Sequence, residues 1–274
     1  MPSASWIERT LSHERRLVVA ALCAVVVASW IYLLAGAGTG MSTVAMTSWQ
    51  MAIGAPRALS MAVATPVEWT ASYAVAMVVM WWVMMIAMML PSAAPVILLH
   101  AKISSAEGRV LPSFCFVAGY VIAWGGFSLA AASLQRLFEF SGVLSPHLMN
   151  TSSNLFAAAI LVFAGAYQLS PLKRACLKHC QGPLAFITHH WKSGARGALR
   201  MGLQHGTYCL GCCAGLMAIL FFGGIMNLYW VAGLALLVLA EKLLPLGSKI
   251  PWLTGPVLII WGLSFLLRVV DSAA

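Results

Sequence analysis

Long apolar stretches separated by short polar segments make up most of this chain. A membrane-spanning helix needs roughly 20 mostly apolar residues, because the hydrocarbon core is about 30 Å thick and a helix rises about 1.5 Å per residue. Seven stretches meet or approach this length: 17–35, 72–99, 112–135, 154–170, 203–222, 228–244 and 252–267. The pattern therefore predicts an all-α fold, a polytopic transmembrane bundle of about seven helices.

From residue 203 to residue 240, the fifth and sixth stretches form one run without Asp, Glu, Lys or Arg. Gly223, Gly224 and Asn227 interrupt this run. Glycine and asparagine at such a break are typical of a turn, so we expect a tight helical hairpin here.

Composition supports the membrane interpretation and excludes one class of partner. Of the 274 residues, 61% are apolar and 8% are charged, whereas soluble domains have about 25% charged residues. The formal net charge is +9, but the basic residues are dispersed between apolar stretches and form no patch interleaved with aromatic residues. We therefore expect no nucleic-acid partner. We interpret the basic residues as determinants of membrane topology and as contacts for anionic lipid headgroups.

The distribution of Lys and Arg predicts an orientation. With the N-terminus inside, thirteen of them fall in cytoplasmic segments and three, Arg57, Arg136 and Arg268, fall outside. The positive-inside rule then predicts an N-in, C-out membrane protein. The predicted segments are a cytoplasmic N-terminus (1–16), a first anchor (17–35), an extracytoplasmic segment (36–71) and a transmembrane bundle (72–270) with a cytoplasmic loop (171–202).

Two expectations concern the N-terminal part. The apolar run at 17–35 is longer than the ~7–15 residues of a cleavable signal peptide, so we expect an uncleaved anchor. The extracytoplasmic segment contains Trp and Met residues, which predicts amphipathic helices at the outer interface.

The most specific candidate for chemistry lies in the fifth stretch. At about 100° per residue, the side chains of His205, Cys209, Cys212 and Cys213 fall within an arc of about 100° of one helix. Because the stretch begins at residue 203, we place them near a helix N-terminus, which stabilises the thiolate that binds metal. The alternative is that these cysteines are small apolar packing residues.

A second cluster follows the fourth stretch. If that helix continues, Cys176, His179 and Cys180 also share one face. The predicted topology puts both clusters at the cytoplasmic side, so we expect them to converge on one site with thiolate ligands suited to Cu(I), Zn(II) or iron. The alternative is an unrelated surface pair of cysteines, and His189 and His190 in the same loop are interpreted as solvated.

Methionines form a stripe in the second stretch. Met80, Met84 and Met88 lie within an arc of about 80°, and thioethers favour Cu(I) over hard ions. The stripe predicts a copper relay from the outer leaflet, with adaptable apolar packing as the alternative. Pro91 and Pro95 are expected to kink or end this helix.

One acidic residue stands at the inner end of the sixth stretch. Glu241 precedes Lys242 there, and an ionisable residue beside a span is usually paired or functional. Glu241 is therefore a candidate metal ligand, with a structural ion pair to Lys242 or Lys173 as the alternative.

Several ordered strings resemble a bacterial family, an uncharacterised domain family of integral membrane proteins predicted to bind metal. The strings are AMMLPS at 87–92, YQLSPLK at 167–173, CLKHC at 176–180, GLQHG at 202–206, CLGCC at 209–213, MNL at 226–228 and EK at 241–242. The resemblance covers residues 75–265. It implies a metal-binding protein of the bacterial inner (plasma) membrane, and it implies no particular reaction.

Together these features predict a heavy-metal-binding protein of the inner membrane. Copper fits best, with zinc or iron as alternatives, and the role would be metal transport or delivery to a membrane or periplasmic protein partner. The chain lacks the GxxxxGK[ST] motif, so a pump driven by its own ATPase domain is not expected. A membrane-bound thiol or metal oxidoreductase and an accessory subunit of a membrane complex are the alternatives.

Overall fold

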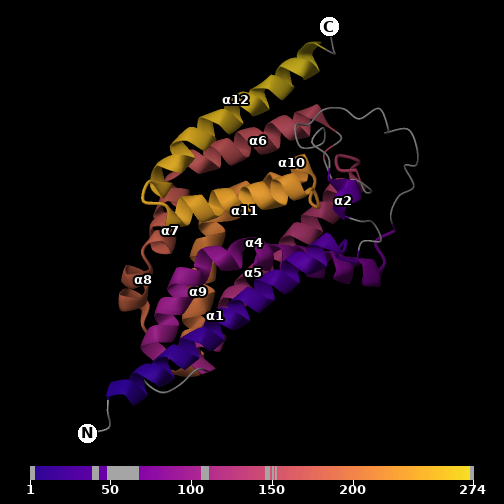
Figure 1. Cartoon of the computed structure of the whole chain (residues 1–274). Helices are drawn as coiled ribbons and strands as arrows, with labels where there is room; N and C mark the ends of the chain where they lie inside the picture. The colour runs from indigo at the N-terminus through magenta and orange to yellow at the C-terminus, as the bar shows by residue number, and fades with distance from the viewer. Residues whose placement is uncertain are drawn as a thin grey trace.

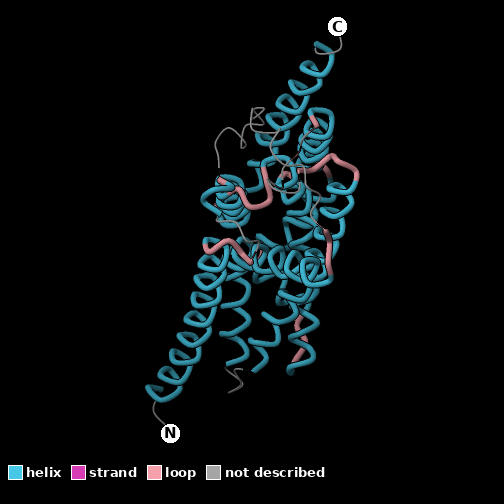
Figure 2. The backbone as a smooth tube through the Cα atoms, turned by 90° about the vertical axis from the view of Figure 1, so that its right-hand side faces the viewer, coloured by secondary structure: helices cyan, strands magenta, loops and turns pink. Residues whose placement is uncertain are grey.

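The computed structural model of the chain describes residues 4–38, 43–47, 68–105, 111–145, 149, 151 and 153–271. The described chain is drawn almost entirely as helix in Figure 2, and this confirms the all-α prediction for these residues. The elements are α1 (Ala4–Leu34), α2 (Thr43–Met46), α4 (Ala71–Ser105), α5 (Leu111–Phe140), α6 (Asn154–Leu169), α7 (Pro171–Gln181), α8 (Pro183–His190), α9 (Gly194–Ala218), α10 (Leu220–Gly223), α11 (Leu228–Leu243), the 3-10 helix η1 (Gly247–Lys249) and α12 (Ile250–Asp271).

Five helical stretches are long and apolar enough to cross a membrane: Arg16–Leu34, Ala71–Ser104, Leu111–Phe140, Gly194–Gly223 and Gly247–Val269. A sixth is reached if the bent pair α6 and α7 counts as one span. The remaining predicted stretch corresponds to α11, which has 16 residues and is about 24 Å long at 1.5 Å per residue. The count of seven therefore stays a prediction.

The segment between α1 and α4 contains most of the predicted extracytoplasmic residues. Residues 39–42 and 48–67 lie outside the described part of the chain, and so do the interfacial helices expected there. The described part includes the short helix α2, whose Met46 is buried.

Helices α6 and α7 meet at a sharp bend, which the sequence pattern did not indicate. Ser170 ends α6 and also caps α7, where its side chain accepts a hydrogen bond from the Lys173 backbone N–H. Pro171 occupies the first turn of α7, where the absence of an N–H has no cost. The two helices are bent by 62° relative to each other, so α7 is a separate helix and does not continue α6.

Helix α4 runs through Pro91 and Pro95 and ends at Ser105. Of the two outcomes expected for these prolines, an end of the helix is therefore wrong, and a kink stays a prediction. The turn predicted between the fifth and sixth stretches is present: Gly224 has φ 97°, and Asn227 caps α11 by accepting a hydrogen bond from the Tyr229 N–H.

Helix α9 packs along α5, and α6 packs along α12 (Figure 1). The α5–α9 contact is close because Gly202 and Gly119 lie at it. A Cβ at Gly202 would meet the Phe116 carbonyl, and one at Gly119 would meet the Leu199 carbonyl. Small residues of this kind allow helix backbones to approach in apolar surroundings, and they fix α9 against the rest of the bundle.

Candidate metal centre

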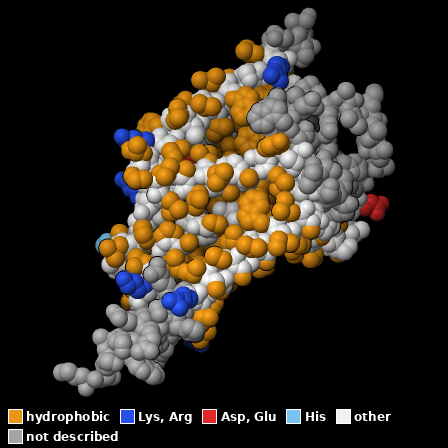
Figure 3. Space-filling model, in the orientation of Figure 1, with side chains coloured by type: hydrophobic (Ala, Val, Ile, Leu, Met, Phe, Trp, Pro, Cys, Tyr) orange, Lys and Arg blue, Asp and Glu red, His pale blue; other side chains and the backbone are white. Residues whose placement is uncertain are grey.

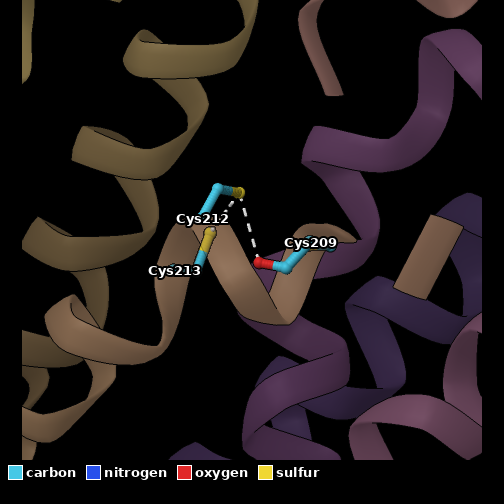
Figure 4. Close-up of side chains that lie close together, drawn as sticks. All are labelled: Cys209, Cys212 and Cys213. Atoms are coloured by element: carbon cyan, nitrogen blue, oxygen red, sulfur yellow. Dashed lines mark hydrogen bonds between the residues drawn. The ribbon is translucent and has the colours of Figure 1, made fainter. Parts of the chain in front are cut away.

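Three thiols of α9 form a compact buried group. The ligand atoms of Cys209, Cys212 and Cys213 lie within 4.8 Å of one another, and the three residues are 0–1% exposed. Figure 4 shows that they come from consecutive turns of α9; Cys212 Sγ lies 3.3 Å from Cys213 Sγ and donates to the Cys209 carbonyl at 3.2 Å. The helical spacing seen in the sequence thus places these thiols together.

A fourth thiol comes from α7. Cys180 is buried, and its sulfur lies 3.8 Å from that of Cys212. The expected convergence of the two cysteine clusters therefore holds for this residue. The bend before α7 makes the contact possible, because it turns α7 back against α9.

The spacing of these sulfurs suits a soft metal ion. With a metal–sulfur distance of about 2.3 Å, two sulfurs on one ion lie roughly 3.7–4.6 Å apart, depending on the coordination geometry. The distances of 3.3, 3.8 and up to 4.8 Å bracket this range, so small side-chain movements bring the sulfurs to coordination distance. Thiols from a single apolar pocket favour Cu(I) or Zn(II) over hard cations.

A lysine completes the pocket from α11. Lys242 Nζ donates to Cys209 Sγ at 2.9 Å and to Ser92 Oγ at 3.0 Å, and Lys242 is only 5% exposed. The Tyr120 hydroxyl lies 3.1 Å from Cys209 Sγ on the α5 side. The ammonium places one positive charge where bound thiolates would concentrate negative charge.

The positive charge beside the thiols comes from Lys242, whereas the sequence predicted that a helix N-terminus would supply it. Helix α9 begins at Gly194, fifteen residues before Cys209 (209 − 194). That separation is about 22 Å along the axis, whereas the effect of a helix terminus is confined to the first turn. The expectation that the thiols lie at a helix N-terminus is therefore wrong.

His205 lies one helical turn before Cys209 and outside the compact thiol group. It is 2% exposed, and its ring stacks on Tyr120 with centroids 5.8 Å apart. Among the described residues, its Nδ1 has no hydrogen-bond partner. A buried nitrogen of this kind is unfavourable unless something satisfies it, and a metal ion is one such partner.

The other members of the second cluster lie beside the thiols. Cys176 is half-buried against α9, where a Cβ at Gly211 would be 2.5 Å from its sulfur. His179 is stacked on Tyr208 at 4.1 Å between ring centroids. The predicted ligand set is thus divided: Cys180 joins the α9 thiols, while Cys176 and His179 occupy neighbouring positions.

Glu241 is engaged in an ion pair. Its Oε2 lies 2.6 Å from Lys173 Nζ, and its Oε1 accepts from Gln168 Nε2 at 2.9 Å. All three residues are buried. These contacts match the structural alternative considered for Glu241, with Lys173 as the partner.

The methionine stripe of α4 leads to the same pocket. Met80, Met84 and Met88 are buried in the core. One residue further along, the Met89 carbonyl accepts from Tyr120 Oη at 3.1 Å and Ser92 Oγ at 2.8 Å. Since both of these groups also contact the Cys209–Lys242 pair, the inner end of the stripe adjoins the thiols.

Sequence reasoning missed Lys242, Tyr120 and Ser92 as parts of the site. The sequence did indicate Lys242, because a lysine in an apolar run is energetically costly unless it is paired. Tyr120 and Ser92 had none, since single hydroxyl groups are common in helices of this kind.

A mostly apolar helical chain that gathers four thiols and a lysine in one buried pocket offers the ligands that soft-metal-binding proteins use. The family model of the PpoB2 copper chaperones matches residues 78–265, which is more than half of the chain. The chain therefore belongs to this copper chaperone family. No curated protein and no solved structure matches it.

Proposed function

We propose that this protein is a membrane-embedded copper chaperone that holds Cu(I) on Cys209, Cys212, Cys213 and Cys180 and delivers it to a protein partner. The observation that carries the proposal is the convergence of sulfurs from α7 and α9 beside Lys242. Cu(I) bound by two or more thiolates carries a net negative charge, and the ammonium offsets one unit of it within an apolar interior, where an isolated charge is costly.

The surface supports placement in a bilayer. Figure 3 shows hydrophobic side chains spread over the visible face, with Lys and Arg at its left and lower-left margins and near the C-terminal end of α12. Side chains such as Leu253 (71% exposed) and Ile260 (69% exposed) on α12 point away from the core. A lipid environment accommodates this surface, and we propose the N-in, C-out orientation in the bacterial inner membrane.

The buried methionines of α4 support a path to the thiols. We propose that Met80, Met84 and Met88 pass Cu(I) along α4 by exchange between thioether ligands. The final step is to Cys209, next to the point where Tyr120 and Ser92 meet the Met89 carbonyl. Because thiolates bind Cu(I) more strongly than thioethers do, the ion would come to rest on the thiols.

The burial of the thiols disfavours the oxidoreductase alternative. Thiol–disulfide exchange requires a thiolate to reach the sulfur of a substrate disulfide. Cys209, Cys212 and Cys213 are enclosed by the helices around them, so a protein disulfide has no direct approach, whereas a small ion needs little room.

The test compares metal content in detergent-purified protein loaded with Cu(I) under reducing conditions. Wild type should retain about one copper per chain, and the Cys209→Ser/Cys212→Ser/Cys213→Ser variant should lose at least about a hundredfold in Cu(I) affinity. Cys23→Ser is the matched control, because Cys23 is an exposed cysteine on α1, and it should bind like wild type.

Folding is checked by size-exclusion chromatography and circular dichroism, since a buried serine hydroxyl costs about 1–3 kcal/mol when it lacks a partner. Cys180→Ser alone provides a milder change and should weaken binding without removing it. Wild type without stoichiometric copper would overturn the proposal, and so would a folded triple variant with wild-type affinity. A mixed disulfide trapped on these cysteines, with no bound metal, would favour the oxidoreductase instead.

A further inference from the structure

We propose that His179 and His190 form a second, accessible Cu(I) site, through which copper is exchanged with the buried thiols. This inference rests on the proposed function and adds the residues that load and unload the centre. His179 is on α7 and His190 ends α8, and both side chains are partly exposed.

The two imidazoles are spaced for a shared ion. Their ring centroids are 6.4 Å apart. With a metal–nitrogen distance of about 2.0 Å, two imidazoles on opposite sides of one ion have centroids roughly 6 Å apart. Two-coordinate binding by neutral imidazole is compatible with Cu(I), and it leaves the ion free to pass to stronger ligands.

Each ring is oriented in the manner of a metal-binding histidine. His179 Nδ1 lies 2.9 Å from the Ala175 carbonyl, and His190 Nδ1 lies 2.9 Å from the Phe186 carbonyl. A carbonyl only accepts hydrogen bonds, so in the neutral rings Nδ1 carries the proton and Nε2 has the lone pair. A hydrogen bond from the other ring nitrogen fixes the tautomer of metal-ligating histidines in this way.

Aromatic contacts connect this pair to the buried histidine of the metal centre. Phe186 stacks on His190 with centroids 4.8 Å apart, and it packs edge-on against His205 at 4.9 Å. Tyr208, on which His179 stacks, directly precedes Cys209 in α9. A small movement of the Phe186 and Tyr208 side chains would open a path for the ion from the exposed pair, past His205, to the thiols.

A surface hollow reaches the His190 end of the pair. It has a volume of about 500 Å³, and its lining includes His189, His190, Lys192 and Arg200. The two cationic side chains disfavour a free cation and favour an anionic copper complex, such as Cu(I) held by small thiolate ligands. The transfer is a ligand exchange without change of oxidation state: a donor–Cu(I) bond breaks as an Nε2–Cu(I) bond forms, and thiolates then displace the imidazoles.

The experiment follows transfer of Cu(I) from its anionic bicinchoninate complex to full-length protein in detergent by stopped-flow absorbance. His179→Ala/His190→Ala should load at least about tenfold more slowly than wild type, and the amount of copper finally bound should still be set by the thiols. Thr188→Ala is the matched control, because Thr188 is an exposed residue of α8 outside the lining of the hollow, and it should load at the wild-type rate.

A second measurement isolates the histidine pair. In the Cys209→Ser/Cys212→Ser/Cys213→Ser background, weakly bound Cu(I) should show nitrogen ligation by X-ray absorption, and that signal should disappear with His179→Ala/His190→Ala. Loading of the double histidine variant within about twofold of the wild-type rate, or nitrogen ligation that persists without the pair, overturns this inference alone. A wild-type protein that takes no copper overturns the proposed function itself.

Discussion

At the residue scale, the charge of Lys242 decides how well the pocket tolerates bound thiolates. Its ammonium lies 2.9 Å from Cys209 Sγ and is held from the other side by Ser92 Oγ. Lys242 is buried with the thiols, so water screens the pair little. An apolar residue at this position would leave an anionic copper–thiolate complex without a counter-charge.

We therefore expect Lys242→Met to lower Cu(I) affinity by about 10–100-fold, the range found for residues that support metal ligands without binding the metal. Competition with a Cu(I) chelator measures the change. Lys249→Met serves as the control, because Lys249 is an exposed lysine close by in the chain. Equal affinities for Lys242→Met and wild type would show that the ammonium does not stabilise the bound complex.

At the scale of the helices, the position of α7 determines whether the fourth thiol reaches the site. Lys173, at the start of α7, pairs with Glu241 of α11 at 2.6 Å. Gln181, at the end of α7, donates to the Glu241 carbonyl at 2.6 Å. Both ends of α7 are thus tied to one residue of α11, and Cys180 is held between them.

Glu241→Gln should destabilise the fold and leave the copper ligands in place. Removing one partner of a buried ion pair costs about 3–5 kcal/mol, because the remaining charge is left unpaired. Unfolding in detergent with increasing denaturant measures this loss, and Glu241→Gln/Lys173→Met should recover most of it. A Glu241→Gln variant of unchanged stability that loses its copper would instead identify Glu241 as a ligand.

The sequence predicted the grouping of the α9 thiols well, because residues 209, 212 and 213 share a helix face by periodicity alone. It did not predict where α9 begins. Residues 194–202 contain Arg196 and Arg200, which lower the hydropathy but do not disfavour a helix. Hydropathy therefore located the apolar part of α9 and missed its polar first turns, which led to the wrong expectation about the helix N-terminus.

The bend at Ser170 was also missed, because the only expectation at this residue was that the helix continues past it. Ser-Pro is a helix-start signal, and here it begins α7 directly after α6. The pairing of Lys173 with Glu241, and of Lys242 with Cys209, depends on how α7 and α11 pack. Contacts between segments about 70 and 30 residues apart are not encoded in a local pattern.

At the scale of the whole molecule, the membrane topology depends on whether α6 and α11 cross the bilayer. Helix α11 has 16 residues, about 24 Å at 1.5 Å per residue, against a hydrocarbon core of about 30 Å. Local thinning of the bilayer accommodates a short span at modest cost, and this permits α11 to cross.

The side of the membrane on which the C-terminus lies distinguishes these arrangements. If α6 and α11 both cross with the five longer stretches, the number of spans is odd, and the C-terminus lies opposite the N-terminus. If only one of α6 and α11 crosses, the number is even and the termini share a side. We expect alkaline phosphatase fused to the C-terminus to be active and green fluorescent protein fused there to be dark, as for a periplasmic end.

The side of the membrane on which the loop before α9 lies identifies the case in which neither α6 nor α11 crosses. The number of spans is then odd as well, but residues 191–193 lie outside the cell. Ser193→Cys in the full chain supplies an exposed thiol at this loop, with the parent protein as background. We expect a membrane-impermeant thiol reagent to label it only after the cells are opened. Labelling in intact cells would place α7, α8 and the histidine pair on the periplasmic side and reverse the direction proposed for copper along α4.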